Sequence, residues 1–217
     1  MPRFLRFIAP GGTFFFTVVT YQRRPVFALP TARRLLRRSI REVQRRRPFT
    51  IEGLVLLPDH LHCIMVLPPG DADFSTRWRK IKEGFTRSYL AQCSVDRVID
   101  PSASTRHSVG RVIDPTSWCR IEPLVSPGRV RKGLRAVWQQ RFWEHTIRDD
   151  ADFGRHMDYI HFNPVKHGHA TCPHAWPWST FSRWVHEGVY ESTWCCVCRR
   201  RRRKTPDFTG LDASAME

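Results

Sequence analysis

Hydrophobic residues recur along the chain at two different spacings, which predict alternating strands and helices. Residues 13–20 are rich in aromatic and β-branched side chains and follow two glycines, so they predict a first strand. Residues 31–47 place apolar side chains at three- and four-residue steps, with arginines between them, which predicts an amphipathic helix capped by Thr31. Two apolar runs, residues 49–56 and 60–67, then predict two more strands.

The second half of the chain continues this alternation. Residues 74–91 predict a second helix with an aromatic and aliphatic stripe on its buried side. Residues 136–145 predict a fourth strand, and a third helix is predicted from Asp149 through His167, with acidic residues in its first turn. Pro164 is expected to disrupt the last turn of that helix and so expose the region around Asn163.

One segment interrupts the pattern and sets the expected domain organisation. Residues 94–102 recur almost unchanged as residues 108–116, and two copies of so short a unit do not build a repeat architecture. We interpret residues 93–130 as an inserted, exposed loop. The chain is then predicted to form one domain over residues 1–190, followed by a basic, disordered tail over residues 191–217.

Charge is the strongest signal in the composition. The chain has 217 residues, with 36 Lys and Arg against 20 Asp and Glu, a formal net charge of +16 that favours polyanionic partners such as nucleic acid. Residues 1–50 hold twelve arginines and one acidic residue, Glu42. A plain solvated surface is the alternative interpretation, because charge alone does not define a site. No uncharged apolar stretch reaches 18 residues, which predicts a cytoplasmic protein without membrane spans.

The cysteines favour reduced thiols. Their number is seven, and an odd number in a chain of this length argues against a disulfide framework. Cys195, Cys196 and Cys198, with Cys172 and His174 upstream, offer an alternative as zinc ligands. Because the spacing lacks a clear second pair, thiols without metal are the favoured interpretation.

Two histidines at the start of a buried strand are the first candidate for chemistry. His60 and His62 are two residues apart, so on a strand they point to the same face. Together they can bind one metal ion, although a hydrogen-bonded structural role is the alternative for either residue alone. The pattern predicts a metal site beside a rigid core.

The same residues resemble a known family, the single-tyrosine HUH transposases, and in particular the REP-associated tyrosine transposases. The sequence His60-Leu61-His62 matches the histidine, hydrophobe, histidine motif of that family. Residues 142–147 and 159–168 resemble the family's segment that carries the nucleophilic tyrosine. The two matches stand in the expected order along the chain.

The resemblance covers residues 12–184, apart from the inserted loop, and it implies a fold and an activity. The implied fold is an α/β (α+β) ferredoxin-like sandwich with a central, mainly antiparallel sheet and flanking helices. The implied activity is cleavage and rejoining of single-stranded or hairpin DNA, such as repetitive extragenic palindromes, through a covalent 5′-phosphotyrosine. The protein would act beside the nucleoid, as a monomer or as a homodimer.

The resemblance also implies the site residues. Tyr159 is the expected nucleophile, and His60, His62 and Asn163 are expected to bind Mg²⁺ or Mn²⁺, where imidazole ligands suit Mn²⁺ as well as or better than Mg²⁺. A phenol has a pKa near 10, so Tyr159 needs help to lose its proton. Basic side chains of the two long helices and of the tail are expected to hold DNA phosphates. These are Arg33, Arg37, Arg41, Arg77, Lys80, Arg87, Arg199, Arg200 and Arg201.

Two alternatives remain open from the sequence. A metal-dependent nuclease would use water in place of Tyr159 and would cleave DNA without a covalent intermediate. A non-catalytic regulator would bind palindromic DNA and cleave nothing under any metal. The sequence motif alone does not separate an active transposase from either alternative.

Overall fold

A four-stranded antiparallel sheet forms the centre of the computed structural model, in the order β2-β3-β1-β4. The structure describes residues 11–99, 137–197 and 205–211, and for residues 94–99 it describes the backbone alone. The strands are β1 (Thr13–Val19), β2 (Thr50–Leu56), β3 (His60–Val66) and β4 (Trp143–Thr146). The expected ferredoxin-like α+β sandwich with a mainly antiparallel sheet is confirmed.

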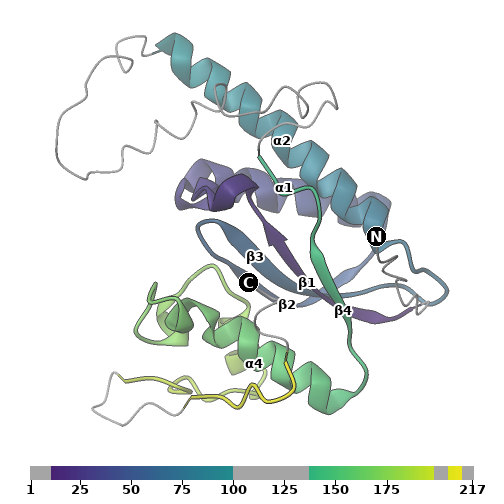
Figure 1. The fold of residues 1–217 in the computed structure, drawn as a ribbon, viewed down its shortest axis with the longest axis vertical. Coiled ribbons are helices and arrows are strands. Elements are labelled where there is room, and N and C mark those ends of the chain that lie inside the picture. Colours follow the sequence, from purple (N-terminus) through teal and green to yellow (C-terminus); the bar gives the residue numbers. More distant parts are fainter. Residues whose placement is uncertain (1–10, 100–136, 198–204, 212–217) are drawn as a thin grey trace.

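Helices cover both faces of this sheet (Figure 1). Helices α1 (Pro30–Arg46) and α2 (Phe74–Ile99) pack on each other and on one face, and α4 (Asp150–Lys166) lies on the other. The predicted stripe of α2 is buried in the largest of the three hydrophobic clusters, which lies under α1 and α2. The shorter helices are η1 (Tyr21–Arg23), η2 (Val26–Ala28), η6 (Pro173–Ala175) and α5 (Phe181–His186). No helix in the described ranges has the length and apolar character needed to cross a membrane.

Strand β3 carries the histidine pair into the middle of the molecule. It has hydrogen-bonded neighbours on both sides, and six of its seven residues are buried. Because side chains alternate along a strand, Leu61 and Cys63 enter the core under α1 and α2, whereas Ile64 enters the core under α4. His60 and His62 therefore belong to the α4 face.

Helix α4 is held at its N-terminus by a cap and in its middle by close packing on that face of the sheet. Asp149 caps the helix by accepting a hydrogen bond from the backbone N–H of Asp152 at 2.7 Å. Farther along, Met157 and Ile160 pack so close to Gly53 of β2 that a Cβ there would lie 2.6 Å from the Met157 sulfur. The glycine thus permits the close approach of helix and sheet that sets the position of Tyr159.

Several predicted boundaries differ from the structure. Leu29 is the N-cap residue of α1 and Thr31 lies inside the helix, because Pro30 already occupies its first turn. Helix α2 continues to Ile99, so the predicted loop does not begin at residue 93. The repeat itself lies mostly among residues 100–136, outside the described residues. Strand β4 has four residues, Trp143–Thr146, so it covers the last three residues of the predicted range 136–145 and one residue beyond it.

The C-terminal part of the chain also differs from its prediction. Helix α4 ends at Lys166, one residue before its predicted end, so Pro164 does not disrupt the last turn, and Asn163 is fully buried and not exposed. The carbonyl of Pro164 accepts hydrogen bonds from the N–H groups of His169 and Ala170, which close the helix end. Residues of the predicted disordered tail pack in the described part: Trp194 and Phe208 both contact Phe162 of α4.

Candidate metal centre and nucleophile

Each histidine of the pair is oriented by a hydrogen bond to its Nδ1 atom. His60 Nδ1 lies 2.6 Å from Asp59 Oδ1, and His62 Nδ1 lies 2.9 Å from the hydroxyl of Thr17, its partner across the β1–β3 ladder. The two rings are 4.9 Å apart. The opposite nitrogens, Nε2 of both rings, are buried and have no hydrogen-bond partner among the described residues. Imidazoles that ligate metals are usually held in this way, with the second nitrogen hydrogen-bonded.

The electrostatics of the pair suit metal binding. Burial, together with the positive charges of neighbouring residues, holds the pKa of His62 well below its usual value, so the ring is neutral. Burial would raise the pKa of Asp59, but hydrogen bonds and charge from His60 and Arg23 outweigh it and lower that pKa to about 2. A neutral imidazole is the form in which a histidine binds a metal, and the Asp59 carboxylate holds the neighbouring ring of His60.

Helix α4 brings the other two predicted site residues to the same place. The ring of Tyr159 lies 5.1 Å from the ring of His62, in an edge-to-face arrangement. Asn163 follows one helical turn later and is fully buried, and neither its amide oxygen nor its amide nitrogen has a hydrogen-bond partner among the described residues. The structure thus gathers residues that lie about a hundred positions apart in the sequence.

These observations test whether the residues fit a divalent ion. Two buried imidazole nitrogens and one buried amide oxygen, none hydrogen-bonded within the described residues, form a mixed nitrogen and oxygen donor set. Unsatisfied polar atoms in a protein interior are costly and call for an explanation. A divalent cation bound by these atoms would satisfy them, and such a set is more typical of Mn²⁺ than of Mg²⁺, which prefers oxygen. The donor set fits the predicted metal.

The candidate nucleophile, Tyr159, is enclosed in this conformation. The Tyr159 side chain is fully buried, with the ring of Phe208 at 5.6 Å and the Lys166 ammonium 5.0 Å from the Tyr159 ring centroid. Phe208 belongs to the C-terminal segment 205–211, which lies over α4. The Tyr159 ring thus lies beside the ring of His62, and segment 205–211 covers it.

Three of the arginines predicted to bind DNA share one groove. Arg33, Arg37 and Arg41 of α1 line a groove of about 1100 Å³, closed on the other side by residues 177–180 and Arg183. The groove has an apolar floor of side chains such as Leu56 and Leu61. Trp178 is partly exposed at its rim, and the guanidinium of Arg33 lies 3.6 Å from the centroid of its ring.

The other basic residues divide into three groups. The prediction for Arg77 is wrong, because its side chain is buried and its guanidinium bonds Asp71 at 2.6 Å and the Pro48 carbonyl at 2.8 Å. Lys80 and Arg87 are exposed on α2, and Lys80 pairs with Glu83 at 3.3 Å. Arg199, Arg200 and Arg201 lie outside the described residues.

Sequence reasoning missed two contributors to this region. Thr17 precedes His62 by 45 residues, and only the pairing of β1 with β3 places them together. An alignment of the two predicted strands in antiparallel register is the signal that would have found it. No role in the site was predicted for Trp178, and nothing local in the sequence indicates that its ring lies beside the guanidinium of Arg33.

Comparisons with known proteins give a consistent result. No protein-family model matches the chain. A REP-associated tyrosine transposase of Escherichia coli is 39% identical over 194 residues, which cover 89% of this chain and 91% of that protein. A relative from Haemophilus influenzae is 30% identical over 89% of this chain and 93% of its own length. A solved structure of a REP-associated tyrosine transposase bound to a REP hairpin is 36% identical, covers 96% of each chain and has a TM-score of 0.64.

Proposed function

Because the chain belongs to the REP-associated tyrosine transposases, we propose that it cleaves and rejoins single-stranded DNA at palindromic hairpins. One observation carries the proposal: Tyr159 and the pair His60 and His62 meet on one face of the sheet, although they come from distant parts of the chain. A relative of known structure is bound to a REP hairpin. That complex supports the same class of substrate here.

Tyr159 supplies the nucleophile in this proposal. Its phenolate oxygen attacks a phosphodiester phosphorus, which forms a phosphotyrosine with the DNA 5′ end and releases a 3′-hydroxyl that takes up a proton. Because the phosphotyrosine conserves the energy of the broken bond, a 3′-hydroxyl can later attack it and restore a phosphodiester. No nucleotide cofactor is needed for strand transfer.

The residues around Tyr159 prepare the phosphate for this attack. We infer that His60, His62 and Asn163 bind Mn²⁺ or Mg²⁺, which when bound supplies a Lewis acid for the phosphodiester oxygens. Asp59 and Thr17 hold the two imidazoles in the orientation that presents Nε2. Burial of the site excludes water from competing with the phenol. All these residues come from one chain, which supports a site that is complete in a monomer.

The DNA is proposed to run along the groove between α1 and the Trp178 segment. Arg37 and Arg41 would contact phosphates, and their exposure on α1 supports this role. Trp178, already stacked under the Arg33 guanidinium, offers a face for an unpaired base. Such binding would place the protein beside the nucleoid.

Access to Tyr159 requires one movement. Phe208 covers the phenol ring in the described conformation, and a DNA strand cannot reach a fully buried side chain. We infer that segment 205–211 leaves α4 before the strand enters. Two residues of the segment, Phe208 and Leu211, pack against the core under α4, and both are only partly buried. Displacing the segment therefore costs far less free energy than unfolding the sheet.

A labelled oligonucleotide tests the proposal. The substrate is a hairpin with single-stranded flanks, incubated with Mn²⁺ and then resolved on a denaturing gel. Wild-type protein should give a cleaved strand and a covalent adduct that protease removes, and Tyr159→Phe should give neither. Tyr21→Phe is the matched control, since Tyr21 lies in η1 away from α4, and it should retain both products.

Other outcomes would identify the alternatives. Continued cleavage by Tyr159→Phe, without an adduct, would contradict the proposal and indicate a nuclease that uses water. Tight hairpin binding by wild-type protein, with no cleavage under Mn²⁺ or Mg²⁺, would instead indicate a regulator that has lost catalysis.

A further inference from the structure

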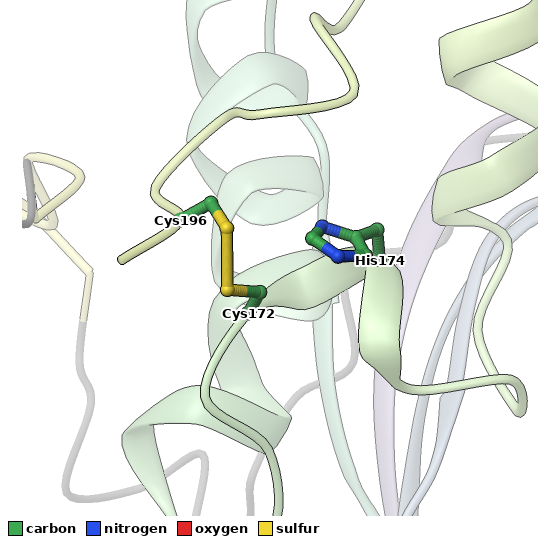
Figure 2. A group of neighbouring side chains, drawn as sticks. All are labelled: Cys172, His174 and Cys196. Atoms are coloured by element: carbon green, nitrogen blue, oxygen red, sulfur yellow. A yellow bond between two sulfur atoms is a disulfide. The ribbon is translucent and has the colours of Figure 1, made fainter. Parts of the chain in front are cut away.

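A second cluster of metal-binding side chains lies away from the histidine pair. Cys172 immediately precedes η6, His174 lies within it, and Cys196 belongs to the segment that follows α5. Their ligand atoms all lie within 4.8 Å of one another. Figure 2 shows the imidazole of His174 beside the two sulfur atoms, which are joined as a disulfide. The expectation of thiols without partners is therefore wrong for Cys172 and Cys196.

We propose that the reduced protein binds one zinc ion through Cys172, His174 and Cys196. Thiolate sulfur and imidazole nitrogen are the donors that zinc prefers, and three donors around one point leave a fourth tetrahedral position for water. Cys172 is fully buried, whereas His174 is exposed to solvent. An ion can therefore enter from solvent.

Contacts that do not involve sulfur hold in place the two segments that carry the ligands, residues 172–175 and residues 190–196. The N–H of Ala175 donates to the Cys172 carbonyl at 3.1 Å, which forms the turn that carries His174. On the other side, Trp194 packs against Tyr190 with ring centroids 4.8 Å apart, and the Cys196 N–H donates to the Thr193 carbonyl. The donors are thus preorganised by packing, and they stay close when the disulfide is reduced.

The redox step that opens the site balances with an ordinary thiol reductant. A small dithiol reduces the Cys172–Cys196 bond by two electrons, gives two thiols and leaves as its own cyclic disulfide. Zinc binding then releases the two thiol protons and yields two thiolate ligands. A protein that acts on DNA works where such reductants keep thiols reduced. The bound ion would tie the Trp194 segment to the end of α4.

Cobalt substitution provides the test, because a thiolate-to-cobalt charge-transfer band cannot arise from His60 and His62. Full-length protein is reduced, freed of metal and titrated with Co²⁺ and then Zn²⁺. We expect an intense charge-transfer band that zinc abolishes, and loss of that band in Cys172→Ser and in Cys196→Ser. His174→Ala should weaken Zn²⁺ binding at least tenfold. Controls are Cys195→Ser, whose sulfur joins the separate cluster with Phe162 and Val165, and the exposed His186→Ala.

The controls should bind Co²⁺ and Zn²⁺ like the wild type. A reduced wild-type protein that gives no charge-transfer band would overturn the proposal, and so would a band that survives in both serine variants. A His60→Ala variant separates the two sites: it should lose the proposed catalytic metal and keep the cobalt–thiolate band. Failure of the DNA-cleavage proposal would leave that band unchanged.

Discussion

At the scale of single residues, the orientation of His62 depends on a hydroxyl that no motif contains. Thr17 is buried, and its Oγ1 lies 2.9 Å from His62 Nδ1, which leaves Nε2 as the ring nitrogen without a hydrogen-bond partner among the described residues. The pattern His60-Leu61-His62 indicates which residues supply imidazole rings to the site. It contains nothing about which of the two ring nitrogens is presented.

A substitution of Thr17 isolates this contribution. Thr17→Val keeps the shape of the side chain and removes the hydroxyl, so His62 should rotate or change tautomer, and Mn²⁺ affinity should fall about 10- to 100-fold. Thr17→Ser retains the hydroxyl and should bind like the wild type. Isothermal titration with Mn²⁺ measures both. Equal affinities in the two variants would show that the hydroxyl does not orient the ligand.

His161 gives a prediction about pH at the same scale. Its side chain is fully buried beside Thr180, and burial, with the charge of Arg183, lowers its pKa to about 3. In the unfolded chain the pKa is about 6.5, so below that pH the unfolded state binds a proton that the folded state does not. Acidification from pH 7 to pH 5 should therefore cost about 2 kcal/mol of stability through this residue alone.

Urea denaturation at the two pH values tests this expectation. His161→Gln keeps an amide donor for Thr180 and does not titrate, so its loss of stability between pH 7 and pH 5 should be smaller than that of the wild type. His186→Gln, at an exposed position on α5, serves as the control and should follow the wild type. An unchanged loss in His161→Gln would mean that the residue does not carry the pH dependence.

At the scale of elements, periodicity predicted the strands and helices better than their ends. The apolar stripe of α2 and the continuous apolar run of β3 follow from burial alone, and both are observed. Helix α4 was predicted to within one residue at each end, but its last turn was not: Pro164 was expected to disrupt that turn, whereas the following backbone N–H groups return to its carbonyl. Segment 205–211 gave no hydrophobic periodicity, and its apolar residues Phe208 and Leu211 pack against the core under α4.

Segment 205–211 yields a prediction about rate. Removing the ring in Phe208→Ala weakens a partly buried contact by about 1 kcal/mol, so Tyr159 should be exposed more often and covalent adduct should form about fivefold faster. Single-turnover assays with the labelled hairpin measure this rate. Thr209→Ala, an exposed change in the same segment, should leave it unaltered. A slower rate in Phe208→Ala would show that the ring supports the active conformation.

At the scale of the whole molecule, charge and shape act together. The net charge of +16 indicated a polyanionic partner, but charge alone did not distinguish the buried Arg77, which bonds Asp71, from the exposed Arg37. The fold makes that distinction, because α1 presents its arginines to a groove bounded by Trp178. Residues 177–180 reach this groove by pairing with the edge of β2, a contact between segments more than 120 positions apart.

Salt dependence tests whether that groove carries the DNA. Each phosphate contact on a single strand contributes about −0.7 to the slope of log K against log salt. The double variant Arg37→Gln and Arg41→Gln should therefore reduce the magnitude of the slope by about 1.4. The matched control, Arg46→Gln and Arg47→Gln, removes the same charge at the end of the same helix, but these arginines pair with Glu42 and Asp73 and do not line the groove. Fluorescence anisotropy of a labelled hairpin over a range of salt concentrations measures both slopes. If the two double variants lowered the slope equally, DNA would be held by the general field of the protein and the groove would have no special role.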